Sequence, residues 1–474
     1  MSPSGVKSFA DNPPLRGGAQ DVFYAQNNIV PLPVITHTKG IFMWDENGNE
    51  YIDASSGPVV SNIGHGNERV ADAMAEQARQ MDFAYSRVAR HQPNIALTDR
   101  IATLSGPGYE RVALSSGGSE AMEIAIKFVR QYVVATGQPQ RQNLLTCQPS
   151  YHGGTIATLG MSGDEALGDF FDGFGMTSHK VPAPLTYRLP KPHTPESYAN
   201  FALDALEAKI QELGPNTVLA FAMEPVGGLA TGCTVPLPTY FEGIREICSR
   251  HGIFLIFDEV LCGTGRTGKF LNAHYYPDAL PDIVVMAKGL GSGYAPLGAT
   301  LFPARLVDHL SALTGFGFSH TYNANPITCA TGLAVLDEYE RLNLIDNAAA
   351  MGGYLRKHVW ALADEFPIIG DVRGKGLLLG IELVADPDSK EPMAAQFLPT
   401  EKIRIHGLNN GLMIYSRRTA GGKYGDWFLL SPPLTITQAE CDELLRRLRR
   451  TLADFVHEWS RTAGCSRSKI EHPD

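Results

Sequence analysis

The sequence lacks the features that would point to nucleic acid, membranes or export. Its 474 residues carry 50 acidic and 40 basic side chains, a formal net charge of −10, whereas a nucleic-acid-binding protein needs a basic surface. It has no run near the roughly 18 apolar residues of a membrane-spanning helix. Its N-terminus lacks the apolar core of a signal peptide. We therefore expect no nucleic-acid partner, no membrane partner and no targeting segment.

Cysteine is also sparse. The seven cysteines are scattered, odd in number and without a CxxC pair of metal-ligand spacing. This pattern is typical of reduced thiols in a cytoplasmic protein, and we expect no metal site.

The length of the chain predicts more than one domain, because 474 residues exceed the size at which a single core stops growing. Hydrophobic residues make up 44% and the mean hydropathy is −0.10, as in ordinary globular proteins. We predict an N-terminal segment (1–66) that packs with a small domain, a large α/β domain (67–325) and a small C-terminal α+β domain (326–474).

Helix and strand patterns alternate through the large domain, which favours a mostly parallel, mixed sheet with helices on both faces. The stretch 162–197, dense in Gly, Pro and aromatic residues, is predicted as a loop near the mouth of the site. Helices are predicted over 67–80, 93–105, 118–136 and 239–250, and strands over 111–115, 143–147, 218–224, 253–259, 282–287 and 298–302.

Further elements are predicted on both sides of the large domain. An Asn-Gly turn between 41–45 and 50–53 predicts a hairpin. Long helices are predicted from 326 to about 344, over 346–365 and over 437–458, with a strand-rich segment starting at Gly370.

Two buried-strand patterns end in residues of opposite chemistry. Lys288 ends Asp-Ile-Val-Val-Met-Ala-Lys, and Asp258 ends Gly-Ile-Phe-Leu-Ile-Phe-Asp. Strands this apolar are normally buried in a parallel sheet, whose carboxyl ends form a rim where ligands bind. A lysine there can form a Schiff base with an aldehyde, and an aspartate can hold a proton on a pyridine nitrogen. Together they predict a site for pyridoxal 5′-phosphate (PLP).

The predicted strand 111–115 runs into Ser-Ser-Gly-Gly-Ser, which ends at Ser119. Small residues at a strand-to-helix turn let backbone N–H groups approach a phosphate, so Gly118 and Ser119 are the expected donors. Alternatively, Ser119 is only the N-cap of the next helix.

Two further strand ends carry candidate groups. Tyr151, in Tyr-His-Gly-Gly, can stack on a pyridine ring, or is simply a buried loop tyrosine. Glu224, which ends the strand 218–224, can orient neighbours at the same rim as Asp258, or is a structural ion-pair partner.

Three other segments leave alternatives open. The stretch 263–269 fits GxGxxG and nearly fits the P-loop, but Phe270 replaces the required Ser or Thr and no helix is expected after it, so we predict a flexible loop packed near the site. The stretch 319–326 is a second phosphate anchor or a plain helix cap. Arg417 either belongs to a solvated pair with Arg418 or binds a substrate carboxylate bidentately.

Taken together, these segments resemble the class III (ω-type, subgroup II) aminotransferases of PLP fold type I, over most of the chain. The most specific stretches are 258–268 and 282–298. Supporting matches are Gly64–Gly66, Gly118–Ala121, Tyr151–Gly153, Glu224–Val226, His320–Tyr322 and Val372–Gly376.

The resemblance implies a homodimer with active sites at the interface. Lys288 would be the Schiff-base lysine and Asp258 the partner of the pyridinium nitrogen, and both are the predicted catalytic residues. Val260 and Tyr151 would cover the two faces of the ring. The full predicted cofactor-binding set is Gly118, Ser119, Tyr151, His152, Glu224, Asp258, Val260, Lys288 and, toward the phosphate of the neighbouring subunit, Thr321.

Three departures from the family pattern concern the substrate. Leu261 stands where the family commonly has Gln, Tyr415 where many amine:pyruvate members have a mobile arginine, and Val59 where several have Trp. The predicted substrate-facing set is Val59, Tyr85, Leu261, Tyr415 and Arg417. Most of these side chains are apolar or aromatic, which favours a donor with a bulky apolar group beside a smaller one.

The expected reaction transfers an amino group from an amine or amino acid donor to a 2-oxo acid in a ping-pong sequence, with Lys288 as the base. The family also includes racemases, an aminomutase and a decarboxylase, and the sequence around Lys288 does not separate these reactions. A non-catalytic homologue is a third hypothesis, which the complete set of lysine, aspartate and phosphate turn disfavours.

Overall fold

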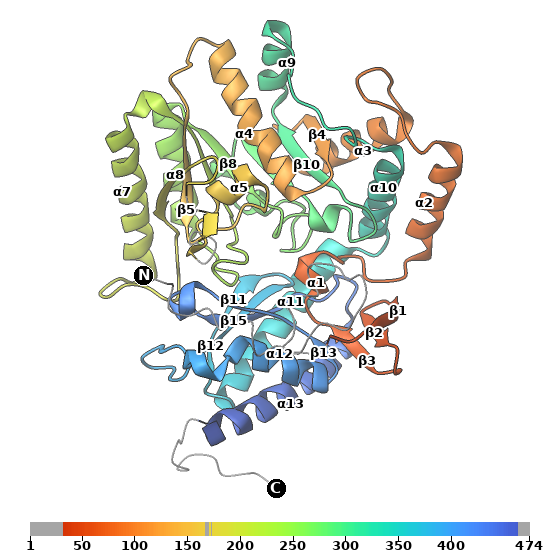
Figure 1. The fold of residues 1–474 in the computed structure, drawn as a ribbon, viewed down its shortest axis with the longest axis vertical. Coiled ribbons are helices and arrows are strands. Elements are labelled where there is room, and N and C mark those ends of the chain that lie inside the picture. Colours follow the sequence, from red (N-terminus) through yellow and green to blue (C-terminus); the bar gives the residue numbers. More distant parts are fainter. Residues whose placement is uncertain (1–31, 166–169, 172, 463–474) are drawn as a thin grey trace.

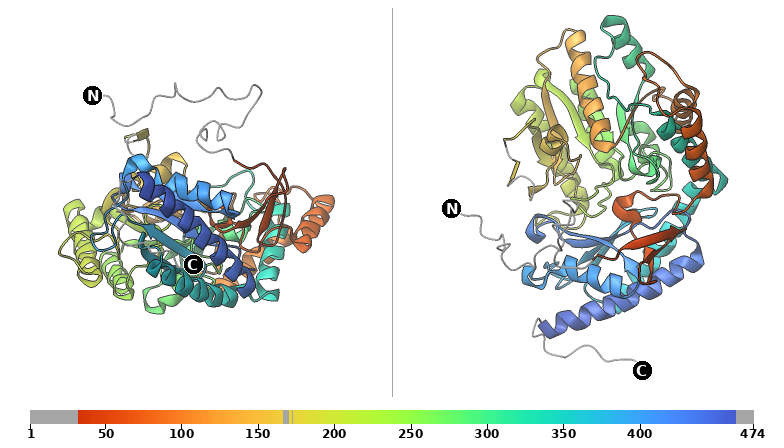
Figure 2. Two further views of the ribbon diagram at one scale, coloured as in Figure 1. Left: turned by 90° about the horizontal axis from the view of Figure 1, so that it is seen from below. Right: turned by 45° about the vertical axis from the view of Figure 1, so that its right-hand side comes forward.

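The structure, a computed structural model, describes residues 32–165, 170–171 and 173–462. These residues form one large sheet and two smaller ones (Figure 1). The large sheet and its helices make up one half of the molecule. The C-terminal elements make up the other half, and the N-terminal strands lie beside them. The long helix α13 (Gln438–Thr462) lies at the end of the molecule opposite to α9 (Ala304–Leu313) (Figure 2).

The large sheet has seven strands, and β10 is the single antiparallel strand among them. Its interior strands are short and almost wholly apolar, as expected for strands covered on both faces. In spatial order the strands are β4 (Arg111–Ser115), β10 (Gly298–Phe302), β9 (Ile283–Met286), β8 (Phe254–Asp258), β7 (Val218–Met223), β5 (Asn143–Gln148) and β6 (His179–Pro182).

Helices cover both faces of this sheet because alternate strand residues point to opposite sides. On β8, Leu255 and Phe257 pack in one apolar cluster, while Ile256 packs in another. The first cluster takes in residues of α3 (Gln92–Ser105), α7 (Pro195–Leu213), α8 (Pro238–His251) and α10 (Pro326–Arg341), and the second those of α4 (Gly118–Ala135), α5 (Ile156–Met161) and α9. Helix α2 (Glu68–Gln80) packs on α10.

The N-terminal strands pair with the C-terminal part of the chain. Strands β1 (Ile35–Lys39), β2 (Phe42–Asp45) and β3 (Glu50–Asp53) form an antiparallel meander, whose Asn-Gly turn is closed by Asp45 Oδ1 accepting from the N–H groups of Asn47 and Asn49 at 2.9 Å each. On its other edge β3 pairs in parallel with β13 (Leu412–Met413). A short, kinked helix, α1 (Ser56–Val59), follows β3.

The C-terminal part has its own antiparallel sheet. Its order is β11 (Ile369–Lys375), β12 (Leu378–Leu383), β15 (Asp426–Leu430) and β14 (Tyr415–Arg418). Helices α11 (Leu344–Ala361), α12 (Pro399–Asn409) and α13 contribute to the same apolar cluster as this sheet. That cluster also contains Ile41, in the turn between β1 and β2, and Ile52 of β3.

The predicted strands, the hairpin and the predicted helices are confirmed, with ends that differ by a few residues. The prediction of one continuous loop over 162–197 is wrong, because this stretch contains β6 and the start of α7. Strand β6 was missed because it is a four-residue edge strand that includes His, Lys and Pro. Helices α9 and α12 were missed as well.

The stretch 263–269 consists of turns and bends, so the predicted loop is confirmed, but the loop is buried rather than loosely packed. All of its residues except Lys269 are buried, and the Arg266 side chain is 0% exposed. Residues 1–31 of the predicted N-terminal segment lie outside the described residues, and the predicted domain boundaries stay a prediction.

The described residues contain neither a disulfide nor a helix fit to span a membrane. Six cysteines are described, and each is buried and free of a disulfide, while Cys465 lies outside the described part. Within the described ranges, no helix combines the length and apolarity needed to cross a membrane.

Candidate active site

A cavity of about 440 Å³ opens at the carboxyl ends of the large sheet. Its lining includes Tyr151 and His152 after β5, Glu224 after β7, Asp258 at the end of β8 and Lys288 after β9. Neighbouring parallel strands end at the same edge, so these five residues, which span 137 positions (288 − 151), meet here. The position is the one at which open α/β sheets bind ligands.

Lys288 begins a single 3₁₀ turn, Lys288–Leu290, with a positive φ of 45°. This backbone region is sparsely populated by residues other than glycine, and such conformations cluster at functional sites. Part of the side chain borders the open cavity, and the rest is enclosed by the protein. Burial lowers the pKa of the Lys288 ammonium from 10.5 to about 8, against the opposing attraction of Asp258. A substantial fraction of this amine is therefore neutral near physiological pH.

Asp258 is held by two contacts at the base of the cavity and is 5% exposed. Its Oδ2 lies 2.8 Å from Nδ1 of His152, and its Oδ1 accepts from the N–H of Val260 at 3.1 Å. His152 is 3% exposed, and its other ring nitrogen, Nε2, is buried without a partner among the described residues. The histidine thus fixes the orientation of the carboxylate, which leaves a buried acid at the floor of the site.

Glu224 holds two loops in place at the same edge of the sheet. Its Oε2 accepts from the N–H of Tyr151 and its Oε1 from the N–H of Gly228, both at 2.9 Å. Gly228 begins a segment, residues 228–234, that we call the wall loop because its Leu229 lines the cavity. Burial raises the pKa of the Glu224 carboxyl to about 7. Glu224 therefore positions Tyr151 and the wall loop through backbone hydrogen bonds.

The turn between β4 and α4 forms the opposite wall. Helix α4 begins after Gly117 without a side-chain cap, which contradicts the alternative that Ser119 is its N-cap. The Ser119 hydroxyl instead accepts from the N–H of Gly154 at 3.0 Å and keeps its own proton to donate. A β-carbon on Gly118 would lie 2.9 Å from both methyl groups of Val260. The turn thus presents uncapped N–H groups at the positive end of an 18-residue helix, as an anion site requires.

The predicted substrate-facing residues lie at different distances from the cavity. Leu261 lines it, whereas Val59 and Tyr415 belong to the same apolar cluster as Leu261 but not to the lining. Val60, next to Val59, lines the cavity. Tyr85 is exposed and does not belong to the lining.

Arg417 on β14 reaches the wall loop. Its guanidinium forms an ion pair with Asp164, whose side chain is 1% exposed, and donates from Nη1 to the carbonyl of Leu229 at 2.9 Å. Arg417 is therefore occupied in this conformation, and its neighbour Arg418 pairs with Asp426. Thr321 is exposed and lies outside the cavity lining, and the helix cap at the end of its segment is Asn325, which accepts from the N–H of Thr328.

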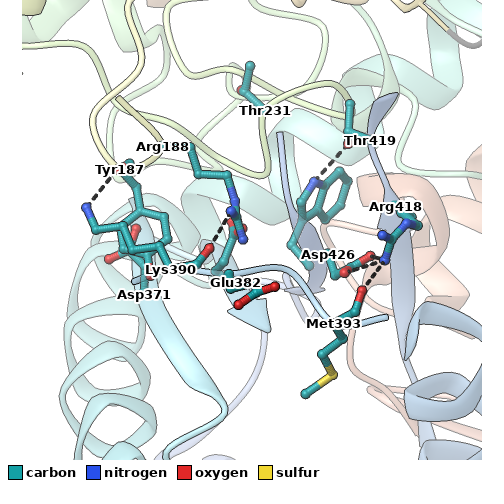
Figure 3. Close-up of polar contacts among 12 residues, drawn as sticks. Tyr187, Arg188, Thr231, Asp371, Glu382, Lys390, Met393, Arg418, Thr419 and Asp426 are labelled. Carbon is teal, nitrogen blue, oxygen red and sulfur yellow. Dashed lines mark hydrogen bonds and ion pairs between the residues drawn. The ribbon is translucent and has the colours of Figure 1, made fainter. Parts of the chain in front are cut away.

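A second guanidinium, that of Arg373, holds the wall loop from the C-terminal sheet. Glu382 on β12, drawn beside Arg188 in Figure 3, is fully buried and accepts from Arg188 Nε at 2.5 Å and from Arg373 Nη2 at 2.7 Å. Arg373 Nη2 also donates to the carbonyl of Thr231 in the wall loop at 3.0 Å. Arg188 instead donates to the carbonyl of Lys390. The position of the wall loop is therefore coupled to a charged network in the C-terminal sheet.

Several lining residues were not predicted from the sequence. The signals for them were weak, since most are small or apolar residues that contribute backbone or shape. They are Val60, Ser116, Gly117, Gly153, Leu229, Ala287, Gly293, Ala295, Pro296 and Leu297.

Comparison with known proteins agrees with this arrangement. The family model "Aminotransferase class-III" matches residues 23–452. A putrescine–pyruvate aminotransferase of Pseudomonas aeruginosa is 33% identical over 90% of this chain and 92% of its own length. A leucine/methionine racemase of Thermococcus litoralis is 32% identical over 92% of this chain and 97% of its own length.

The fold is shared with solved transaminases. A PLP-bound amine transaminase from an uncultivated Pseudomonas species superposes with a TM-score of 0.84 at 32% identity, covering 92% of this chain and 97% of the other. The large mixed sheet with helices on both faces is the fold type I architecture of these enzymes. With a family model that spans nearly the whole chain, this protein belongs to the class III aminotransferases.

Proposed function

We propose that this aminotransferase uses PLP, bound at Lys288, to move an amino group from an amine or amino acid donor to a 2-oxo acid in two half-reactions of a ping-pong sequence. The observation that carries the proposal is the meeting of Lys288, Asp258 and the uncapped N-terminus of α4 around one cavity. An amine, a buried acid and an anion site are the three protein groups that PLP requires.

The residues present fit this cofactor. The backbone N–H groups of Gly118 and Ser119 and the Ser119 hydroxyl would hold the phosphate, and Asp258 would face the ring nitrogen. Val260 and Tyr151 line the cavity between these groups and would cover the two ring faces. A side chain at Gly118 would collide with Val260. The absence of a side chain there leaves room for the cofactor to approach the backbone closely.

The protein's own groups hold and move protons at stated atoms. When bound, PLP supplies an electron sink for the electron pair of the donor's broken C–H bond. The neutral Lys288 amine would take the proton from the donor carbon that bears the amino group and pass it to the aldehyde-derived carbon of PLP, and a pKa near 8 suits this task. Asp258, oriented by His152, keeps a proton on the ring nitrogen. Tyr151, held by Glu224, excludes water from one side.

The donor side of the cavity favours an apolar group. Leu229, Leu261 and Val60 line it, and further apolar side chains back them. We propose that the donor carries an apolar substituent toward this wall. Arg417, which contacts the carbonyl of the lining residue Leu229, is our candidate for binding the carboxylate of the 2-oxo acid, and it would have to exchange Asp164 for that carboxylate.

We further propose a homodimer with shared sites. The described surface carries exposed apolar and aromatic side chains, including Phe83, Val88 at 81% exposure and Tyr322 at 65%, and the rings of Phe83 and Tyr322 pack against each other. Exposed patches of this kind mark interaction sites. The exposed Thr321, next to Tyr322, would then face the partner's phosphate. A cytoplasmic location stays a prediction from the cysteine pattern.

Borohydride trapping of the purified holoenzyme followed by peptide mass mapping tests the proposal directly. The expected result is a single reduced cofactor adduct on Lys288, together with an absorbance change when an amine is added without acceptor. An adduct on another lysine, or none, would overturn the assignment.

The racemase relative supports one alternative, in which the same site only inverts an amino acid. The enzyme incubated with a chiral amine and pyruvate is expected to form alanine. Inversion of leucine or methionine without any alanine from pyruvate would favour the racemase.

A further inference from the structure

Arg266 is a buried charge that the proposed chemistry does not use. It lies in the turn-rich segment after β8 and is 0% exposed. Its guanidinium donates to the carbonyls of Leu377 and Pro432, to the Ser56 hydroxyl and to Asn62 Oδ1. All four acceptors are neutral, and no ion pair to Arg266 occurs among the described residues. Asp53 acts on Arg266 electrostatically but forms no ion pair with it. Burying a charge that is not directly paired with an opposite charge is costly.

Asn62 connects Arg266 with the turn that carries Lys288. Its amide oxygen accepts from Arg266, while its amide nitrogen donates to the Tyr339 hydroxyl at 2.7 Å and to the carbonyl of Thr264 at 3.2 Å. Asn62 is 1% exposed, so its amide has one orientation that satisfies all three partners.

The Asn62 amide lies directly against the residue after Lys288. A β-carbon on Gly289 would lie 2.1 Å from Asn62 Nδ2, and the Tyr339 hydroxyl lies 3.3 Å from the carbonyl of Gly289. The next residue of the same segment, Ile63, donates its N–H to the Ser292 hydroxyl at 2.9 Å, and the Ser292 N–H donates to the carbonyl of Lys288 at 2.9 Å. Asn62 and Ile63 therefore hold both ends of the Lys288 turn.

We propose that Arg266 and Asn62 are positioning residues, which together clamp the strained turn so that the Lys288 amine stays at the floor of the cavity. The proposal rests on the proposed role of Lys288. The positive φ of Lys288 needs such support, because a strained backbone conformation persists only where its surroundings fix it. The planar Arg266 guanidinium fixes Asn62 in turn. It connects Ser56 and Asn62 to the backbone carbonyls of Leu377 and Pro432, in the C-terminal part of the chain.

The test compares Asn62→Ala with Asn143→Ala. Asn143 also has a side-chain amide with two partners, Thr217 and His179, but it lies at the start of β5, away from the Lys288 turn. For Asn62→Ala we expect a kcat about 10–100-fold lower, with the KM for the amine nearly unchanged, because small displacements of a reacting group cost this much in rate. For Asn143→Ala we expect wild-type kcat.

A second readout uses the cofactor-free protein. PLP is added, samples are quenched with borohydride at successive times, and the yield of the Lys288 adduct is measured in each sample. In Asn62→Ala we expect the adduct to form about tenfold more slowly than in wild type. Arg266→Lys, which keeps the charge but loses the planar fork, should show an intermediate rate. Equal labelling rates and equal kcat in folded Asn62→Ala and Asn143→Ala would overturn the inference. Absence of any adduct on Lys288 in the wild type would instead refute the proposed function.

Discussion

The two ends of the cavity are built from different parts of the chain. At the floor, Asp258 and Lys288 are fixed by strands of one sheet and by contacts within a few ångströms. At the donor wall, Leu229 belongs to a loop that arginines of the C-terminal sheet hold by its carbonyls. The floor is charged and the wall is apolar. Changes at the floor should therefore abolish the chemistry, whereas changes at the wall should alter which substrate reacts well.

Lys288→Ala should have the largest effect, because it removes both the cofactor's attachment point and the base. We expect amino-group transfer from a chiral amine to pyruvate, measured as alanine formation, to fall at least about 10³-fold. Transfer at a wild-type rate in this variant would mean that the floor of the cavity is not where the chemistry occurs.

Asp258→Asn should have the next largest effect. We expect the variant to bind cofactor but to lose about 10²–10³-fold in kcat, because a neutral amide cannot hold a proton on the ring nitrogen. Glu259→Gln is the matched control: Glu259 is the adjacent buried acid, it accepts from the N–H groups of Asn272 and Ala273, and burial raises its pKa to about 7. Its expected kcat is close to that of wild type, with a loss of stability of about 1–3 kcal/mol. Equal kcat losses in both variants would remove the distinction between the two acids.

The pH dependence of Lys288 reactivity sharpens the contrast with surface lysines. In the cofactor-free protein, the rate at which an amine-reactive reagent labels Lys288 should rise about tenfold per pH unit up to pH 8. The rate should level off above pH 8, since burial lowers the pKa of Lys288 to about 8. Because the folded state then binds fewer protons than the unfolded state between pH 8 and 10.5, this lysine makes the protein more stable as pH rises through that window. A labelling rate that keeps rising to pH 10 would contradict the burial argument.

The smallest expected effect concerns the donor wall. Arg373→Lys and Arg188→Lys both weaken contacts with Glu382, but only Arg373 also holds Thr231. One hydrogen bond of about 0.5–1.5 kcal/mol corresponds to roughly a 2–10-fold rise in the KM for the amine in Arg373→Lys. Steady-state kinetics should show unchanged kcat there and unchanged KM in Arg188→Lys. A similar KM rise in both would mean that the wall loop does not depend on the Thr231 contact.

The placement of Asp258 and Lys288 at the floor could be predicted because it depends on a short stretch of sequence. An apolar strand and the residue that ends it are contiguous, so Asp258 and Lys288 could be placed at the edge of the sheet without knowledge of any distant segment. The open N-terminus of α4 was predicted by the same reasoning, from Gly118 and Ser119.

The donor wall and the clamp could not be predicted in this way. Leu229 looks like any loop residue, and only its contacts with Arg417 and the cavity give it a role. Arg266 lies among glycines that suggested a mobile loop, and its burial depends on Asn62 and Pro432, which are far from it in sequence. Tyr85 and Thr321 lie outside the cavity of a single chain, so their predicted roles depend on a second copy.

The pairing of β3 with β13 has a consequence for biosynthesis. Asp53 pairs with Met413, 360 positions later (413 − 53). A ribosome adds roughly 5–20 residues per second, so the first strands wait about 20–70 s before their neighbour has been made. Throughout that interval one edge of the nascent meander stays unpaired and open to other chains. Slow translation or crowded polysomes should therefore lower the yield of native protein, and a chaperone that shields this edge should restore it.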